Sequence, residues 1–465
     1  MTIPESAYRA LRSRFRGALV RPGEEGYENA RRVWNGAIDR RPAMIARCAG
    51  ADDVAEAVRF ARESALPASV RGGGHAVAGH AVCDGGIMID LSLMRDVTVD
   101  PAARTARAAG GCLWADVDKA TQQFALATTG GIISHTGVGG LTLGGGLGHL
   151  MRRAGLTVDN LLAVELVTAD GKQRTIDDSH EPELFWALRG GGGNFGVATA
   201  FHYRLHPVGP LVLAGPVFWP LEQAPKVLPV LRDLATHAPD ALGVTFVTML
   251  APPMPFLPPE QYARPVLGMV VVWSGDLQDG ARAIEPLRQA GTPLADVVRP
   301  VPYLAVQSML DVGALPGRHY YWKSHRLPKL TDDAIDVIVG HAEAITSPFS
   351  QIGGWVMGGA VSRVAPEATA VGVREPGYDI NVTAGWAPSD TSGERHRSWV
   401  RDGWRALHPF SSGVYANFIS DEGDAGVRAA YGERLARLTA VKDRYDPDNF
   451  FRMNANIPPS KGGTA

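Results

Sequence analysis

The chain has few cysteines and no strong excess of either charge. Only three of its 465 residues are cysteine, and Cys48, Cys83 and Cys112 show no metal-ligand spacing. A small, odd number of cysteines is typical of reduced thiols and argues against a disulfide framework. Lys and Arg number 46 against 48 Asp and Glu, a net charge of −2. We therefore expect no nucleic acid and no membrane as partner, because nucleic acids and anionic membranes both attract a concentrated basic surface.

Long apolar runs are missing as well. No stretch approaches the roughly 20 apolar residues of a membrane-spanning helix, and the N-terminal sequence MTIPESAYRALRSRFRG lacks the apolar segment of a signal peptide. These features predict a cytoplasmic protein. With 465 residues and 45% hydrophobic content, the chain is long enough to form two domains.

Glycine, in contrast, is concentrated in two clusters. Residues 71–75 read Arg-Gly-Gly-Gly-His, and nine of the nineteen residues from Gly130 to Gly148 are glycine. Residues without a Cβ atom let the backbone approach a flat or anionic ligand, and the N–H groups of such a loop can surround phosphate oxygens. A single cluster is equally typical of a tight turn between strands. Two clusters, one ending in His75 and the other containing His135, favour a ligand site.

Two common phosphate-binding motifs do not fit. The P-loop needs a Lys directly after its last glycine, but Gly148 is followed by His149 and Leu150. A G-x-G-x-x-G pattern occurs at 191–196, yet it follows a helical stretch and leads into a strand-like one. A Rossmann fingerprint requires the opposite order, so these glycines do not indicate a dinucleotide-binding fold of that kind.

Hydrophobic periodicity predicts two small α/β units followed by a larger sheet. Strands are predicted at 43–48, 68–70, 86–91, 97–99, 105–109, 162–168, 172–176 and 197–205, and helices at 52–64, 113–124 and 182–188. Asp52 or Asp53 is the expected N-cap of the first helix. Longer apolar strands follow at 211–218, 244–250, 266–273, 351–357 and 380–386, with a helix at 332–344, which fits an antiparallel sheet with helices on one face. A last helix is predicted over 426–445, ending at Asp446-Pro447.

Five motifs in this order resemble the berberine-bridge-enzyme-like branch of the vanillyl-alcohol-oxidase superfamily. They are RGGGHAVAGHAVCDGGIMIDLSL (71–93), TTGGIISHTGVGGLTLGGGLGHLMRRAGLTVDN (128–160), VELVTADG (164–171), LFWALRGGGGNFGV (184–197) and YDPDNFFRMNANIPP (445–459). The resemblance spans nearly the whole chain and is nearest to bacterial members, which include the hydroxynicotine oxidases and the enterocin flavoenzyme. It implies an α+β fold. A PCMH-type FAD-binding domain of two α/β subdomains would occupy 1–206, a substrate-binding domain with a helix-covered antiparallel sheet 207–410, and a return to the FAD-binding domain 411–465.

The resemblance also implies the cofactor and its attachment. In the family, the histidine that matches His75 is bound covalently to the C8 methyl group of FAD. Doubly linked members carry a cysteine in the second glycine loop, where this chain has Ile133, so we predict a single link. The residues expected at FAD by their place in the motifs are Arg71, Gly72, Gly73, Gly74, His75, Gly79, His80, His135, Thr136, Gly137, Gly139, Gly140, Gly144, Gly145, Gly146, Gly148, Asn160, Val167, Asn454 and Asn456.

The catalytic base is harder to predict. Many relatives place a Glu on the strand that matches 351–356, but this chain has Gly353 and Gly354 there. Tyr321 and Lys323 are predicted as a catalytic pair, because residues two apart on a strand face the same side and an ammonium lowers a phenol's pKa. An ordinary half-buried surface pair is the alternative. The resemblance adds Tyr415, in a Tyr-x-Asn segment, as a second base or substrate clamp.

The substrate domain is rich in aromatic residues, which can line an apolar pocket or simply fill a core. They are Trp219, Phe246, Trp273, Tyr303, Tyr320, Tyr321, Trp322, Trp355 and Trp386. We expect a flat phenolic, polyketide or alkaloid-like substrate, oxidised by FAD with dioxygen as second partner. The alternatives are a flavin dehydrogenase or monooxygenase-like tailoring enzyme of secondary metabolism, and a flavin-binding protein without turnover. No ligand spacing predicts a metal, and a homodimer is compatible with the sequence.

Overall fold

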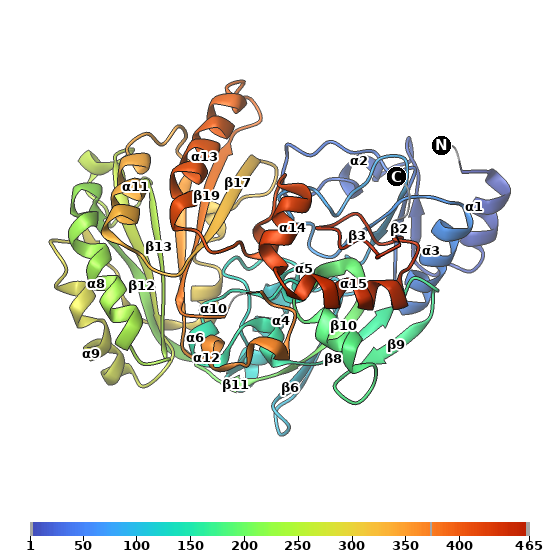
Figure 1. Ribbon diagram of the computed structural model, residues 1–465, viewed down its shortest axis with the longest axis horizontal. Helices are drawn as coiled ribbons and strands as arrows, with labels where there is room; N and C mark the ends of the chain where they lie inside the picture. The colour runs from blue at the N-terminus through green and yellow to red at the C-terminus, as the bar shows by residue number, and fades with distance from the viewer. Residues whose placement is uncertain (1–2, 373, 462–465) are drawn as a thin grey trace.

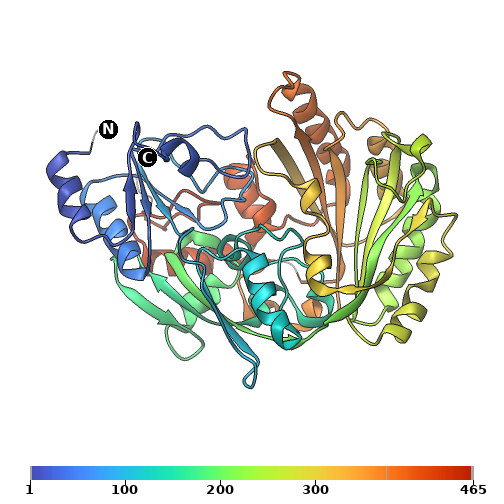
Figure 2. The ribbon, with the colours of Figure 1, turned by 180° about the vertical axis from the view of Figure 1, so that it is seen from behind.

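The computed structural model describes residues 3–372 and 374–461 and has two lobes, which are seen from opposite sides in Figures 1 and 2. The N-terminal part of the chain builds one lobe around two sheets. The middle part builds the second lobe around a single large sheet, and the C-terminal segment returns to the first lobe (Figure 1). Each lobe has its own principal apolar core. The α+β fold expected from the sequence is confirmed.

The first sheet has four strands in the order β1-β2-β4-β3 and carries the first glycine turn. Its strands are β1 (Ala18–Val20), β2 (Met44–Arg47), β3 (Ala68–Arg71) and β4 (Ile87–Asp90). Strands β2, β4 and β3 are parallel, and helix α3 (Ala51–Glu63) connects β2 to β3 as a crossover. Strand β3 ends at Arg71, so the Gly72–Gly74 turn begins at the carboxyl edge of a parallel sheet, where ligands commonly bind.

The start of helix α3 differs from the prediction. Its N-cap is Gly50, without a side-chain cap, and not Asp52 or Asp53. The Asp53 carboxylate instead accepts hydrogen bonds from the backbone N–H groups of Arg16, Gly17 and Ala49, at 2.8 to 2.9 Å. The aspartate therefore holds the N-terminal segment against the first sheet, a long-range role that local capping rules cannot reveal.

The second sheet is antiparallel and encloses the long glycine loop. Its order is β5-β6-β10-β8-β9, with β5 (Val97–Asp100), β6 (Thr105–Ala109), β8 (Leu161–Val167), β9 (Gln173–Ile176) and β10 (Val197–Arg204). The expected hairpin joins β8 to β9 through Asp170-Gly171. Helices α4 (Trp114–Thr121), α5 (Val138–Leu143) and α6 (Met151–Ala154) lie in the connection from β6 to β8, and α7 (Pro182–Leu188) precedes β10. The long glycine loop is therefore part of the connection between β6 and β8, two strands of the same sheet.

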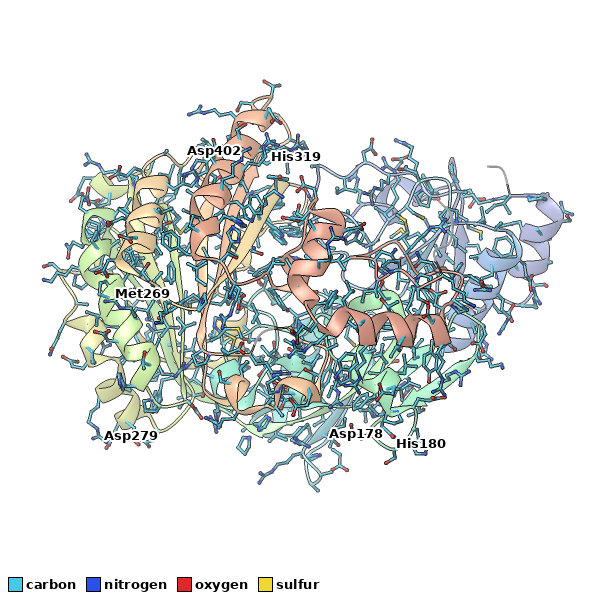
Figure 3. All side chains as sticks on the ribbon, viewed as in Figure 1. Asp178, His180, Met269, Asp279, His319 and Asp402 are labelled. Atoms are coloured by element: carbon cyan, nitrogen blue, oxygen red, sulfur yellow. The ribbon has the colours of Figure 1, made fainter. Side chains whose placement is uncertain are left out.

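The second lobe is an eight-stranded antiparallel sheet with helices on one face. Its main order is β15-β12-β14-β13-β18-β19-β17, and β16 also pairs with β12. The strands are β12 (Leu211–Pro220), β13 (Leu242–Leu250), β14 (Pro265–Trp273), β15 (Ala295–Asp296), β16 (Arg299–Pro302), β17 (His319–Leu327), β18 (Gln351–Met357) and β19 (Gly377–Trp386). Helices α8 (Ala224–His237), α9 (Leu277–Arg288), α11 (Asp332–Ala342) and α13 (Gly393–Leu407) cover the outer face (Figure 1). Met269 on β14 belongs to the core beneath them (Figure 3). The opposite face is turned toward the first lobe.

The C-terminal segment forms two helices where one was predicted. Helix α14 (Gly423–Tyr431) ends at Gly432, which has φ +51°, and α15 (Arg434–Tyr445) follows. The apolar spacing continues through the break, which explains why the sequence pattern suggested a single helix. Near the end of α15, the buried Lys442 ammonium donates to Asp446 Oδ2 at 2.6 Å and to the carbonyl oxygens of Asn194 and Phe451. These bonds fasten the last residues to the first lobe.

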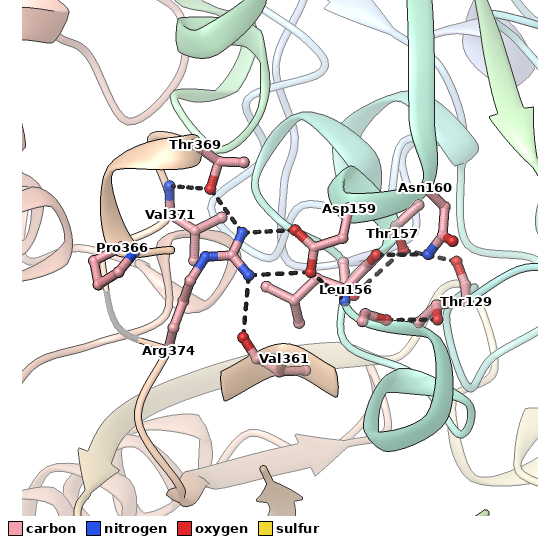
Figure 4. A network of polar contacts seen from close by, with 12 residues as sticks. Thr129, Leu156, Thr157, Asp159, Asn160, Val361, Pro366, Thr369, Val371 and Arg374 are labelled. Atoms are coloured by element: carbon pink, nitrogen blue, oxygen red, sulfur yellow. Dashed lines mark hydrogen bonds and ion pairs between the residues drawn. The ribbon is translucent and has the colours of Figure 1, made fainter. Parts of the chain in front are cut away.

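A buried ion pair joins the segment after β18 to the end of the glycine loop (Figure 4). The Arg374 guanidinium donates to both carboxylate oxygens of Asp159, at 2.7 and 3.0 Å, and also to Thr369 Oγ1 at 2.7 Å. Asp159 Oδ2 accepts a further hydrogen bond from the Leu156 N–H. The two side chains are only 3% and 6% exposed, so neither charge has water as an alternative partner.

We predict that the stability of the protein depends on pH through the buried Asp118. Asp118 lies on α4, and its Oδ2 accepts one hydrogen bond, from Gln307 Nε2 at 3.0 Å. Burial raises the pKa of Asp118 to about 7, and the Gln307 bond offsets only part of that shift. Because the folded-state pKa is above the unfolded value, this stabilisation is complete below about pH 4 and is lost as the pH rises through 7. A shift of about three pKa units corresponds to a loss on the order of 4 kcal/mol at most.

We expect Asp118→Asn to flatten the decline in stability between pH 4 and pH 8. The amide keeps an acceptor for Gln307 and adds a donor for the buried Gln307 Oε1, which has no hydrogen-bond partner among the described residues. Thermal unfolding midpoints across this range measure the effect. Asp116→Asn is the control, because Asp116 lies on the same helix but pairs with Arg95 near the surface. Equal slopes in Asp118→Asn and the wild-type protein would show that Asp118 does not titrate in this range.

Candidate functional site

A single cavity of about 1080 Å³ lies between the two lobes and brings the sequence motifs together. One wall consists of the glycine clusters, and the other is the inner face of the large sheet. The segments around 192–196, 415–419 and 451–455 complete the lining. Chain segments from all parts of the sequence therefore converge on one site.

The glycine wall is too tight for side chains where the two glycine clusters meet, at Gly73 and Gly137. A Cβ atom on Gly73 would lie 2.4 Å from the Gly137 nitrogen, and a Cβ on Gly137 would lie 2.3 Å from the Gly73 nitrogen. The two glycine clusters thus touch backbone to backbone at the cavity. Such close approach leaves peptide groups exposed to a ligand, the arrangement that glycine loops provide for phosphates.

His75 lies at the end of the first glycine turn in an aromatic stack. Its ring stacks on Trp34 with centroids 4.3 Å apart, and Trp34 stacks on Tyr320 at 3.9 Å. His75 Nε2 is 3.2 Å from His135 Nδ1, so the two predicted histidines are in contact. Deep burial lowers the pKa of His75 to about 3, and His135 adds to that decrease. The His75 imidazole is therefore neutral at physiological pH.

The structure separates the predicted cofactor residues into two groups. Those that line the cavity are Gly72, Gly73, Gly74, His75, His80, Thr136, Gly137, Gly139, Gly140, Gly144 and Asn454. The others support the loops from behind and are Arg71, Gly79, His135, Gly145, Gly146, Gly148, Asn160, Val167 and Asn456. Arg71 donates to the Ala30 carbonyl, and the Asn160 amide donates to the carbonyls of Ala154 and Leu156. These contacts give Arg71 and Asn160 structural roles in the folded chain.

The C-terminal asparagines carry unused hydrogen-bond acceptors. Asn454 donates to the Gly193 and Phe451 carbonyls, which fixes its amide orientation. The buried Oδ1 atoms of Asn454 and Asn456 accept no hydrogen bond from the described residues. Because buried polar atoms in folded proteins are normally paired, these two acceptors indicate that a donor from a ligand or from water belongs here.

Alternation along the strands places one set of side chains on the cavity and the other under the helices. On β17, Tyr320 and Trp322 face the cavity, and on β18 Gln351, Gly353 and Trp355 do so. Further lining residues on the neighbouring strands are Asn381, Thr383, Thr245, Val247, Met249, Pro216 and Phe218. The wall is thus aromatic and apolar, with a few uncharged hydrogen-bonding groups. Trp219, Trp273 and Trp386 belong to the core under the helices.

The predicted catalytic pair lies on the face of the sheet that is turned away from the cavity. Tyr321 and Lys323 alternate with the cavity residues of β17, and Tyr321 packs in the core beside the outer helices. Tyr321 donates to Asp421 Oδ2 at 3.0 Å, and Lys323 donates to Asp421 and Glu422 at 2.6 and 2.8 Å. The same-side rule was right, but it could not tell which side faces the substrate.

The pKa shifts at this pair argue against a base as well. Burial raises the pKa of Tyr321 more than the nearby Lys323 ammonium lowers it. Burial by itself would lower the pKa of Lys323, but the two carboxylates outweigh it and the pKa is raised. Both groups therefore stay protonated at neutral pH.

Tyr415 does reach the cavity. Its hydroxyl oxygen accepts hydrogen bonds from the Gly146 N–H and from Asn417 Nδ2, each at 2.8 Å. Burial raises the pKa of Tyr415 to about 12, with these donors lowering it in part. The phenol is therefore protonated, and its own proton is available to an acceptor in the cavity. Tyr415 is thus suited to clamp a ligand or donate a hydrogen bond, and unsuited to act as a base in its resting state.

We expect Tyr415→Phe to loosen the second glycine loop. The change leaves the Gly146 N–H and the Asn417 amide without their acceptor, at a cost of about 1–3 kcal/mol for a buried unpaired group. A lower unfolding midpoint and a weaker retention of bound ligand should follow. Tyr431→Phe is the matched control, because Tyr431 also lines the cavity and its hydroxyl has no hydrogen bond to the described residues. Equal effects of the two changes would contradict this role of Tyr415.

Of the two glycines at the place of the missing glutamate, one faces the core and the other faces the cavity. Gly354 faces the core, where a Cβ atom would lie 2.2 Å from the Phe246 ring. Gly353 faces the cavity, and a Cβ there would meet no atom closer than 3.6 Å. Space for a side chain therefore exists at 353, but no Asp or Glu is found among the described residues that line the cavity.

Sequence reasoning missed several residues of the site. Trp34 precedes every recognised motif, and nothing in its neighbourhood marks it as part of the stack on His75. Gln351, Asn381 and Thr383 lie at alternate positions of predicted strands, and pairing these strands in register would have placed them on one face. Asp311, whose carboxylate accepts from the Ser134 backbone N–H at 2.8 Å and its hydroxyl at 2.6 Å, connects the second lobe to the loop of His135.

Comparisons with known proteins agree with this site. Residues 42–177 match the family model of the FAD binding domain, and residues 414–458 match the model described as berberine and berberine like. An FAD-linked oxidoreductase of Dictyostelium discoideum is 32% identical over 450 residues, covering 95% of each chain. The (R)-6-hydroxynicotine oxidase of Paenarthrobacter nicotinovorans is 32% identical over 459 residues, covering 96% of this chain and 97% of the relative.

Solved structures show the same architecture. The 6-hydroxy-D-nicotine oxidase of Arthrobacter nicotinovorans superposes with a TM-score of 0.86 at 30% identity, covering 96% of this chain and 98% of that one. A chitooligosaccharide oxidase gives a TM-score of 0.87 at 21% identity, which is evidence for the fold alone. The fold and the site define an FAD-binding oxidoreductase of two lobes. The chain belongs to the berberine-bridge-enzyme-like family of FAD-linked oxidoreductases.

The residues present fit FAD. The cavity is continuous, and its glycine wall has no room for side chains at Gly73 and Gly137, where the backbone is open to a ligand. The unpaired acceptor of Asn454, which lines the cavity, offers a partner for a donor of the cofactor. None of the described helices is long and apolar enough to cross a membrane. Over the same described ranges, no three His, Cys, Asp or Glu side chains are grouped as a metal site.

Proposed function

We propose that the protein is an oxidase that carries FAD on a single covalent link through His75 and oxidises a flat aromatic, polyketide or alkaloid-like small molecule. FAD held in this cavity would supply the redox chemistry: a hydride from the substrate would be passed on to dioxygen, which with one proton from the substrate or from water gives hydrogen peroxide. The observation that carries this proposal is the single cavity in which the glycine clusters and His75 face an aromatic sheet wall. One relative that is 32% identical over nearly the whole chain is named as an oxidase.

The attachment is supported by the surroundings of His75. Its Nε2 is in contact with His135, which leaves Nδ1 as the ring nitrogen for the link. Nucleophilic attack needs a neutral imidazole, and burial keeps His75 neutral. Ile133 lines the cavity where doubly linked relatives carry a cysteine, and Cys48, Cys83 and Cys112 are buried away from the lining. These features favour one link and not two.

The substrate is proposed from the opposite wall. Tyr320, Trp322 and Trp355 offer flat apolar surfaces, which suit an aromatic ring. Gln351, Asn381 and Thr383 add uncharged donors and acceptors that would orient it. With no carboxylate among the described lining residues, the chain cannot remove a substrate proton as a Glu-bearing relative would. A substrate that loses a hydride without prior deprotonation, or one whose proton passes directly to water, fits this wall best.

Two further candidates use the same cavity. The protein would be a flavin dehydrogenase or a monooxygenase-like tailoring enzyme of secondary metabolism if the reduced flavin met oxygen differently, and the missing carboxylate favours FAD binding without turnover. We further propose that the cofactor domain spans 1–206 and 411–465 and the substrate domain 207–410, since the last segment contributes Asn454 to the cavity.

Anaerobic reduction separates these candidates. The purified holoenzyme is mixed with a panel of phenols, benzylic alcohols and cyclic amines, and bleaching of the flavin absorbance is recorded. We expect at least one compound to reduce the flavin, and peroxide to form in equal amount when oxygen is admitted. Reduction without peroxide would identify a dehydrogenase. No reduction by any member of the panel would favour a binding protein.

A further inference from the structure

The cavity is nearly free of charge, with one exception. The described lining residues include no Asp, Glu or Lys. His75 and His80 have pKa values lowered by burial to about 3 and about 4, so both rings are neutral at physiological pH. Arg318 is the one permanently charged side chain in this lining. Arg318 is partly exposed, and a cation at the edge of an otherwise uncharged cavity can pair with an anionic group of a ligand that enters it.

Arg318 has no counter-ion in the described part of the chain. No carboxylate there lies within ion-pair distance of its guanidinium, whose carbon instead lies 3.7 Å from the centre of the Phe349 ring. Stacking of this kind holds the planar group in place, with its N–H donors directed outward in the plane. The Arg318 charge and a hydrogen bond to the Tyr320 phenol partly offset the effect of burial on the pKa of Tyr320, so the guanidinium lies beside that phenol. The side chain is therefore oriented but has no counter-ion.

Arg318 lies where the cavity opens to solvent. It directly precedes β17, and the next residue, His319, is labelled in Figure 3 at the end of that strand between the lobes. Val312 and Pro348 line the cavity and are exposed at its surface. The Arg318 backbone is held across the gap, since its carbonyl accepts from the Gly36 N–H at 2.8 Å. The stack from Tyr320 through Trp34 to His75 leads inward from this point.

We propose that Arg318 is an anion-binding subsite of the substrate cavity. The substrate would be a flat, mostly apolar molecule with a carboxylate at the end remote from the carbon that is oxidised. The carboxylate would pair with the guanidinium at the mouth, in the two-pronged geometry that arginine favours, while the apolar part enters between the aromatic wall and the glycine wall. This inference rests on the proposed function and specifies the substrate of that site.

The phosphates of FAD are a poorer partner for Arg318. The glycine clusters that suit phosphates belong to the first lobe, whereas Arg318 is in the second and stacks on Phe349 there. A hydrated arginine with only a stacking role is the remaining alternative. In the following experiment, each of these two alternatives predicts a result different from that expected for a substrate carboxylate.

The experiment compares acids with their neutral amides. Benzoate, cinnamate and 2-naphthoate, with the three corresponding amides, are titrated into the holoenzyme, and binding is followed by perturbation of the flavin spectrum and by calorimetry. We expect at least one acid to bind about 10-fold or more tightly than its amide. In Arg318→Gln that preference should disappear, and Arg318→Lys should restore part of it. Arg397→Gln is the control, because Arg397 stacks on Trp386 but lies outside the cavity lining.

Three outcomes would overturn the proposal. No acid binds more tightly than its amide, or Arg318→Gln keeps the preference, or Arg318→Gln loses FAD from the purified protein while Arg397→Gln retains it. The last outcome would assign Arg318 to the cofactor. None of these measurements depends on turnover, so a holoenzyme that reduces no substrate can still show the charge preference, and an active oxidase can still lack it.

Discussion

His75→Ala should leave a protein from which all FAD can be removed. When the wild-type protein is precipitated with acid, we expect the pellet to stay yellow and its His75 peptide to gain the mass of FAD. In the variant the pellet should be colourless and the FAD should appear in the supernatant, a change from about one covalent flavin per chain to none. Ala is chosen because it removes both ring nitrogens and the stacking on Trp34.

A second histidine of the same cavity provides the control. His80 lines the cavity and is also neutral, so His80→Gln changes a comparable ring without touching the proposed anchor. Its covalent flavin should be retained. A yellow His75→Ala pellet, or a flavin mass on any other peptide, would show that the link is made elsewhere. A colourless wild-type pellet would show that FAD is held without a covalent bond, and it would leave the cavity and the family assignment unchanged.

Arg374→Met should be strongly destabilising for a change outside the hydrophobic cores. It removes the partner of the buried Asp159 carboxylate, which would then keep only the Leu156 N–H as hydrogen-bond donor. Breaking one side of a buried ion pair costs about 3–5 kcal/mol, because the remaining charge is uncompensated. Denaturant unfolding followed by tryptophan fluorescence measures this loss. FAD retention should fall as well, since Thr157, two residues before Asp159, hydrogen-bonds Thr129 and Gly146 of the glycine loop.

An exposed ion pair of the same chain provides the control for this prediction. Arg437 donates to both carboxylate oxygens of Glu183, as Arg374 does to Asp159, but the two side chains are 43% and 54% exposed. Arg437→Met should therefore cost only about 0–1 kcal/mol. The double change Asp159→Leu with Arg374→Met should recover part of the stability, because no charge is then left unpaired. Similar losses in Arg374→Met and Arg437→Met would contradict the importance given to burial.

Local patterns predicted the elements of the fold better than their assembly. Strand β18 was predicted at its observed bounds from its apolar run, and β6 and helix α7 likewise. The break between α14 and α15 at Gly432 was not predicted, because the apolar spacing continues on both sides of it. Asp53 was read as a cap, because its true partners near residues 16 and 17 are distant in sequence.

The candidate site shows the same limit more sharply. His75 could be predicted because the glycine turn and the family motif mark it directly. The position of Tyr321 and Lys323 depended on which face of β17 turns toward the first lobe, and a period of two leaves that choice open. Trp34 and Arg318 have no motif, and only the approach of the two lobes brings them to the cavity. Contacts between distant segments therefore carried the information that the sequence patterns lacked.

The return of the chain to the first lobe sets an order on biosynthesis. Asn454 and Ala455 are the last lining residues along the chain, and Lys442 fastens this segment by bonds to Asn194 and Phe451. While residues 442–455 are still inside the ribosome, the wall that they supply is absent even if both sheets have already formed. The cavity can thus close only after this segment has emerged, and a cofactor that needs the whole wall can be held only from that point on.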